Sequence, residues 1–121
     1  MKRVLSPIFV LVALVVASTA EDAAPSCKGT TLPIVGKCFR FTGRLGLYNG
    51  GHTYWIWRVG MNHRYWVEGE LPATIDQGGL DWDHYYRGNF DACPTTVFKK
   101  GHAQGICLQS ASKLTTTERT N

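Results

Sequence analysis

The sequence lacks the short motifs that mark most catalytic and metal sites. It holds no G-x-S-x-G nucleophile turn, no H-E-x-x-H zinc motif and no glycine-rich loop that cradles phosphate. None of its four cysteines lies in a C-x-x-C or C-x-x-H spacing, which zinc–thiolate sites usually need. With 121 residues, the chain is too short for a two-domain enzyme or a full nucleotide-binding α/β domain. We therefore expect neither a cofactor nor a metal ion.

A concentrated block of positive charge is also absent. The chain holds 13 Lys and Arg against 9 Asp and Glu, and no run of basic residues exceeds two. Nucleic-acid-binding proteins normally carry their basic side chains on one concentrated face. The scattered charges therefore predict that nucleic acid is not a partner.

The longest apolar run lies at the N-terminus and is too short to span a bilayer. A short basic segment, residues 1–3, precedes an almost wholly apolar stretch over residues 4–17. The small residues 18–20 follow it. This is the order of a secretory signal. A spanning helix needs about 20 apolar residues, and Pro7 interrupts this run. We predict that residues 1–20 are a cleaved signal peptide and that the product is periplasmic or secreted, with no stable membrane span.

Four cysteines in a small exported chain indicate two disulfides. Cys27, Cys38, Cys93 and Cys107 allow three pairings. We favour the local pairing, Cys27–Cys38 and Cys93–Cys107, which closes loops of ten and thirteen intervening residues. Each bridge is expected to contribute about 2–4 kcal/mol through the unfolded state. The bridges matter because a core of this size supplies at most about 5 kcal/mol of net stability.

The first half of the domain has the pattern of a β-meander. Apolar and polar residues alternate from 38 to 48, which predicts a half-buried strand. Asn49-Gly50-Gly51 predicts a turn, and residues 52–59 predict the returning strand. A second turn over residues 60–63 leads to a third strand over residues 64–68.

The second half has weaker patterns. A loop follows the third strand, and residues 81–86 are compatible with a short helical turn. A short strand is expected at residues 91–93, ended by Pro94, and a last strand at residues 104–112. The whole pattern predicts an all-β fold, a small antiparallel barrel or sandwich of five or six strands stabilised by disulfides.

Four segments follow from these patterns. The signal peptide is followed by a loose lead-in segment over residues 21–37, which is rich in small residues and proline. The β domain is expected to cover residues 38–112, and the polar residues 113–121 are expected to form a flexible tail.

Two pairs of short sequence segments resemble segments of known proteins. Gly43 to Gly50 reads G-R-L-G-L-Y-N-G and Ile56 to Gly60 reads I-W-R-V-G, while Cys93-Pro94 precedes Cys107-Leu108-Gln109-Ser110-Ala111. In this order they resemble a group of small exported bacterial proteins of uncharacterised activity, in which the last segments read C-P-F and C-I-E-S-A. The chain departs from the group at Met61, Thr95 and Gln109, where the group has Thr, an aromatic residue and Glu. The resemblance implies export, one domain and a Cys93–Cys107 bridge; it implies no activity, ligand or catalytic residue.

Aromatic side chains gather on the second and third predicted strands. Neighbours along a strand point to opposite faces, so the core cannot hold all of them. In one arrangement, rings on the outward face bind a sugar or a protein. That binding face comprises Tyr54, Trp55, Trp57, Tyr65 and Trp66, with Arg58 and Arg64 at its rim. In the other arrangement, Trp55, Trp57 and Val59 fill the core while Tyr54 and Tyr65 pair on the outside.

Asp81, Asp83 and His84 are the alternative site. Two carboxylates and an imidazole could bind a divalent cation or perform acid–base chemistry, as a small secreted hydrolase requires, although a polar surface loop explains them more simply. The remaining histidines, His52, His63 and His102, fall in or beside predicted turns, where an exposed histidine is ordinary. The sequence therefore favours a non-enzymatic binding or structural module of the cell envelope over a hydrolase. Its partner is expected to be an envelope glycan or an exported protein.

Overall fold

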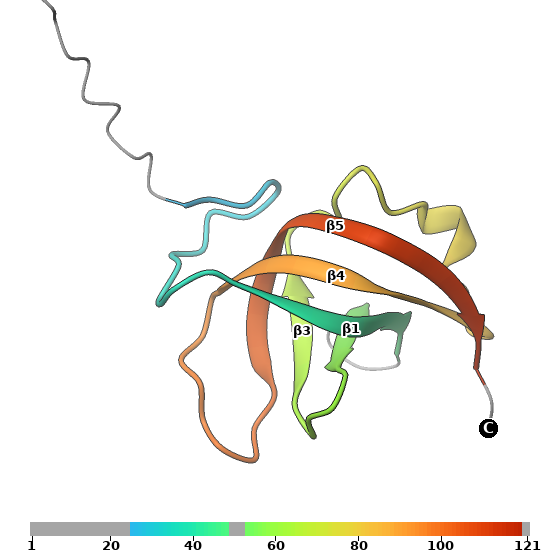
Figure 1. Ribbon diagram of the computed structural model, residues 1–121. Helices are drawn as coiled ribbons and strands as arrows, with labels where there is room; N and C mark the ends of the chain where they lie inside the picture. Colours follow the sequence, from blue (N-terminus) through green and yellow to red (C-terminus); the bar gives the residue numbers. More distant parts are fainter. Residues whose placement is uncertain (1–24, 49–52, 120–121) are drawn as a thin grey trace, which may run out of the picture.

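The computed structural model describes residues 25–48 and 53–119, and almost all of its regular structure is β-strand (Figure 1). The strands are β1 (Phe39–Leu47), β2 (Tyr54–Arg58), β3 (Arg64–Glu68), β4 (His84–Pro94) and β5 (Gln104–Glu118), with the 3-10 turn η1 (Gln77–Gly79) before β4. Among the described residues, no helix is long and apolar enough to cross a membrane. The predicted Asn49-Gly50-Gly51 turn lies outside the described residues.

The five strands form one closed barrel in the order β1-β2-β3-β5-β4. Strands β1, β2 and β3 pair as the antiparallel meander that the sequence predicts, and β4 pairs antiparallel with both β1 and β5. The pair β3–β5 is parallel and closes the barrel, so the sheet is mixed rather than wholly antiparallel. This order is the topology of the oligonucleotide/oligosaccharide-binding (OB) barrel. The prediction of a small disulfide-stabilised β fold is confirmed.

The core consists of the inward positions of the strands. On β1 the exposure alternates as predicted, with Phe41 and Leu45 buried and Arg40, Thr42 and Arg44 exposed. Fully buried side chains from all five strands meet inside the barrel: Leu45, Ile56, Tyr65, Phe90 and Ile106. The alternation of one apolar and one polar face is therefore what closes the sheet around its interior.

Strands β4 and β5 are much longer than predicted. The helical turn expected over residues 81–86 is wrong, and the short strand expected over residues 91–93 is the end of a longer one, because His84–Pro94 form one strand of 11 residues. The last strand continues six residues past its predicted end, to Glu118, and so includes part of the expected tail. Strand β4 lies between β1 and β5, and hydrogen bonding along both edges stabilises an extended chain whose own periodicity is weak.

The two ends of the barrel differ. The loop between β3 and β4 covers one end (yellow in Figure 1) and buries Leu71, Ile75 and Leu80 in the core. The Tyr86 hydroxyl donates to the Asp76 carbonyl oxygen at 2.9 Å and holds this loop in place. The loops between β2 and β3 and between β4 and β5 lie at the opposite end, where they surround a cavity.

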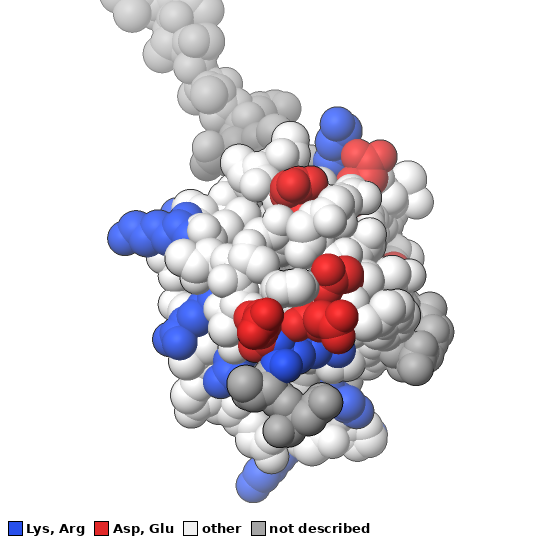
Figure 2. Space-filling model, turned by 90° about the vertical axis from the view of Figure 1, so that its right-hand side faces the viewer, with Lys and Arg blue, Asp and Glu red and all other residues white. Residues whose placement is uncertain are grey.

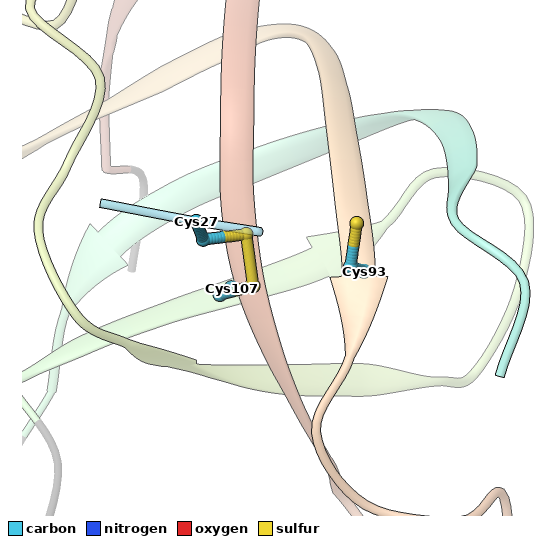
Figure 3. Close-up of side chains that lie close together, drawn as sticks. All are labelled: Cys27, Cys93 and Cys107. Atoms are coloured by element: carbon cyan, nitrogen blue, oxygen red, sulfur yellow. A yellow bond between two sulfur atoms is a disulfide. The ribbon is translucent and has the colours of Figure 1, made fainter. Parts of the chain in front are cut away.

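The disulfides are Cys27–Cys107 and Cys38–Cys93, so the predicted local pairing is wrong. Cys38 lies just before β1 and Cys93 near the end of β4, and these strands are neighbours in the sheet. Cys27 places the lead-in segment against β5, where it bonds Cys107 (Figure 3). Cys93 and Cys107 do face each other across β4 and β5, but each is bonded elsewhere, so the bridge implied by the resemblance is also wrong.

Asp91 links three strands on the outer surface. Its carboxylate accepts hydrogen bonds from Arg40 on β1, with Nε–Oδ1 at 2.7 Å and Nη2–Oδ2 at 3.0 Å. The hydroxyl of Ser110 on β5 donates a further bond to Oδ2. The Arg40 hydrogen bonds, with that of Ser110, lower the pKa of Asp91 to about 2.

We expect Asp91→Asn to reduce the free energy of unfolding at neutral pH by about 1 kcal/mol or less, because the ion pair is open to solvent. The folded-state pKa lies below the unfolded value of about 3.9, so the stabilisation is present above that value. It is lost as the pH falls through about 2. Urea unfolding of both proteins between pH 2 and 7 tests this. A difference in stability that stays constant down to pH 2 would contradict it.

Candidate functional site

The structure divides the seven predicted binding residues between the two faces of the β2–β3 hairpin. Tyr65 is only 2% exposed and lies in the core, and Tyr54 packs against the core at its edge. Arg58 also lies on this inner side, because its guanidinium stacks on core rings of β1. The other four lie on the outer side of the barrel and are half-buried or exposed: Trp55, Trp57, Arg64 and Trp66.

This division corrects both arrangements considered from the sequence. Tyr65 is not part of an outward face, since its ring lies 4.9 Å from that of Phe41 inside the barrel. Trp55 and Trp57 do not fill the core either, because Ile56 between them is the buried residue of β2. The central inward positions of the hairpin are thus occupied by Ile56 and its register partner Tyr65.

We name Trp55, Trp57, Arg64 and Trp66 the outer aromatic face. Trp55 is the register partner of Trp66, and their rings meet edge to face at 6.2 Å. Trp57 is the partner of Arg64, whose guanidinium carbon lies 5.1 Å from the Trp55 ring centre and 5.8 Å from that of Trp57. Such cation–π contacts fix the side chains of neighbouring strands in one arrangement.

The Trp66 ring is held on both sides. Its Nε1 donates to Oε1 of Glu68 at 2.8 Å. The ring also lies over Gly105, the parallel partner of Trp66 on β5. A Cβ at Gly105 would come within 2.8 Å of the indole, so a side chain there would displace the ring. Sequence reasoning missed Gly105, because the β3–β5 pairing that brings it under Trp66 is not visible in a local pattern.

Two further arginines extend the outer aromatic face across the sheet. Arg44 on β1 is the register partner of Trp57 on one side and of Arg87 on the other. The row from β3 to β4 therefore reads Arg64, Trp57, Arg44, Arg87. Within residues 25–48 and 53–119, none of these three arginines forms an ion pair with a carboxylate. Sequence reasoning missed Arg87 as a site residue because the β1–β4 pairing joins segments more than 40 residues apart. Arg44 was missed although the predicted hairpin places it opposite Trp57.

Several acidic side chains gather at the end where β4 begins and β5 finishes, with basic side chains beside them (Figure 2). There His84 Nδ1 donates to Asp81 Oδ1 at 2.7 Å. This hydrogen bond lowers the pKa of Asp81 and, with the nearby negative charges, raises the pKa of His84. Asp83 gives its backbone N–H to the same oxygen, so its carboxylate is not part of the pair.

Three cysteine sulfurs lie close together, and all three are bonded in disulfides. Atoms of Cys27, Cys93 and Cys107 lie within 4.8 Å of one another (Figure 3). Metal binding requires thiolates. Each of these sulfurs is instead bonded in a disulfide.

His63 corrects the expectation that the turn histidines are exposed. It is 9% exposed, and its ring stacks edge to face on Tyr65 at 4.7 Å. Its Nε2 lies 3.3 Å from Oε1 of Gln104. The β2–β3 turn folds over the barrel end and so buries it. His102 is exposed, as expected, and His52 lies outside the described residues.

Fold and site together define a small disulfide-linked β-barrel that carries neighbouring arginine and tryptophan side chains on its outer surface. Comparison of the chain with models of known protein families, with curated proteins and with solved structures finds no match.

Proposed function

We propose that the protein is an exported, non-enzymatic binding module that recognises an acidic glycan of the cell envelope. The binding surface is the outer aromatic face together with Arg44 and Arg87. The observation that carries this proposal is the cross-strand row Arg64–Trp57–Arg44–Arg87, in which one indole ring lies between arginines.

The chemistry of the row suits a sugar that bears anionic groups. The CH face of a pyranose stacks on a flat indole, and carboxylates or phosphates accept paired hydrogen bonds from guanidinium groups. Arg64 stacks on Trp55 and Trp57. A guanidinium that stacks by its flat face keeps its in-plane N–H donors for an anion. With neighbouring strands about 4.8 Å apart, four strands give a surface about 14 Å long, enough for an extended oligosaccharide.

Two further observations support export and binding. Two disulfides fit a compartment outside the reducing cytosol. Barrels of this strand order bind oligosaccharides or oligonucleotides on the face of β2 and β3, which is the face that carries the tryptophans here. The second point is an analogy of fold.

The test is calorimetric titration with oligogalacturonate, an acidic glycan. We expect saturable binding that weakens with salt, and we expect Trp57→Ala to weaken it by roughly 5- to 150-fold, since one stacked ring contributes about 1–3 kcal/mol. The matched control is Trp82→Ala, which removes a tryptophan that is 56% exposed and lies outside the outer aromatic face. Binding should be unchanged in that variant.

Dextran, a neutral glycan, and a short oligothymidylate are titrated in parallel. Equal affinity for dextran would contradict the role of the arginines. If the oligonucleotide alone binds, the ligand of this surface is a nucleic acid instead of a glycan, and the proposal is wrong. Binding of none of the three ligands would leave the exported protein as the partner and overturn the proposal.

A further inference from the structure

A second feature lies at the open end of the barrel, away from the outer aromatic face. It is a cavity of about 310 Å³, which we name the barrel-end pocket. Its wall includes Phe39 from β1, Tyr65 from β3, Met61 from the β2–β3 turn and Phe98 from the β4–β5 loop. Mouths of β-barrels are common places for small-molecule sites, and this volume is at the lower end of their usual range.

Exposed apolar side chains concentrate around the barrel-end pocket. Among the described residues, six large hydrophobic side chains are exposed, and four of them line it: Val35, Met61, Val97 and Phe98. Val97 is 76% and Phe98 59% exposed. Leaving such side chains in water is unfavourable, and an exposed apolar patch of this kind usually marks an interaction site.

The charged side chains that line the barrel-end pocket are positive. Arg58 and Lys37 line it, and no Asp or Glu is among its described lining residues. The Arg58 guanidinium lies 5.9 Å from the Phe39 ring centre and 5.8 Å from that of Phe41. Its Nη1 donates to the Tyr65 hydroxyl at 3.4 Å. It forms no ion pair with a carboxylate in the described part of the chain.

A half-buried guanidinium on aromatic rings, with no acidic partner, is complementary to an anion. The remaining polar groups of the wall are bonded to one another and do not supply that anion. The His63 imidazole pairs with Gln104 at 3.3 Å, and Gln104 Nε2 donates to the Thr96 carbonyl at 2.9 Å. These bonds also fix the loops around the pocket, so the cavity is formed before any ligand arrives.

We propose that the barrel-end pocket binds a small amphipathic carboxylate. The alkyl chain occupies the apolar cavity between Phe39, Met61 and Phe98, and the carboxylate pairs with Arg58, with Lys37 adding a second positive charge. This site is independent of the glycan surface, because Arg58 and Trp57 are neighbours on β2 that face opposite sides of the sheet.

The experiment titrates the full mature protein with hexanoate, octanoate and decanoate below their micellar concentrations. We expect one-to-one binding whose affinity increases about fourfold for each added methylene until the cavity is filled, because each buried CH₂ contributes about 0.8 kcal/mol. We expect 1-octanol to bind at least tenfold more weakly than octanoate, and octyltrimethylammonium not to bind, since both lack the anion that Arg58 recognises. The methyl signal of Met61 should shift on saturation.

Arg58→Met keeps the apolar stem and removes the charge, so it should weaken octanoate at least tenfold and leave 1-octanol unchanged. The double variant Val97→Ser/Phe98→Ser removes two exposed apolar side chains from the pocket wall and leaves the core unchanged. It should weaken the binding of both octanoate and 1-octanol. Trp57→Ala should leave octanoate binding unchanged, and Arg58→Met should leave glycan binding unchanged.

Three results would overturn the proposal: equal affinity for octanoate and 1-octanol, octanoate binding that is the same in Arg58→Met, or no saturable binding of any chain length. The comparison of head groups uses the wild-type protein and therefore holds even if Arg58→Met does not fold. None of these results affects the glycan titrations.

Discussion

Replacing Cys27 and Cys107 by alanine is expected to lower the free energy of unfolding by about 4 kcal/mol. The bridge spans 80 residues, and a loop of that length restricts the unfolded chain strongly in the chain-entropy model. The Cys38–Cys93 bridge spans 55 residues and is expected to contribute nearly as much, about 4 kcal/mol. The local pairing would close loops of only ten and thirteen intervening residues and contribute about 3 kcal/mol each.

The measurement is thermal unfolding of the wild type and of the two double-alanine variants. A loss of this size in a domain of about 100 residues lowers Tm by roughly 15–30 °C. The Cys38→Ala/Cys93→Ala variant is the matched comparison and should fall by a similar amount. A Tm within 5 °C of the wild type in either variant would contradict the assigned bridges.

The second large effect is expected at Ile56. Its side chain is fully buried among the inward residues of the barrel, so Ile56→Ala should cost about 2–5 kcal/mol of unfolding free energy. Trp57, the next residue along β2, is only half-buried on the outer face. Trp57→Ala should cost less than Ile56→Ala although it removes a much larger side chain, since truncation on the outer face leaves a space open to water instead of an enclosed cavity.

Urea unfolding of both variants tests this order. The comparison isolates the face of the strand, because the two residues are neighbours on the same element. If Trp57→Ala were the more destabilising change, Trp57 would belong to the core and the outer aromatic face would not exist as described.

The meander β1–β3 could be predicted because its information is local. Alternation from Phe39 to Leu47 distinguishes an inner from an outer face, and glycine marks the turn at Gly60. Strand β4 could not be predicted in the same way. The pattern of buried and exposed side chains along β4 follows from its pairing with β1 and β5. A bulge between Arg87 and Asn89 interrupts the alternation of the two faces.

The disulfides and the full extent of the candidate site depend on contacts that are distant in sequence. The sequence gives only the number of residues between two cysteines. Which cysteines form a disulfide depends on which strands are neighbours in the sheet, as Cys38 and Cys93 show. Alternation likewise requires that Trp55 and Ile56 face opposite sides and leaves open which side is inward. The parallel β3–β5 closure fixes the choice, because it turns Tyr65 toward the interior and lays Trp66 over Gly105.

The most direct test of the proposed binding surface observes the tryptophan side chains themselves. The chain has four tryptophans, so the ¹⁵N–¹H spectrum holds four indole signals, of which Trp55, Trp57 and Trp66 belong to the outer aromatic face. On titration with oligogalacturonate we predict that these three signals shift together with one dissociation constant while that of Trp82 stays in place. A saturating titration in which the three remain unchanged, or in which only Trp82 moves, would contradict the account.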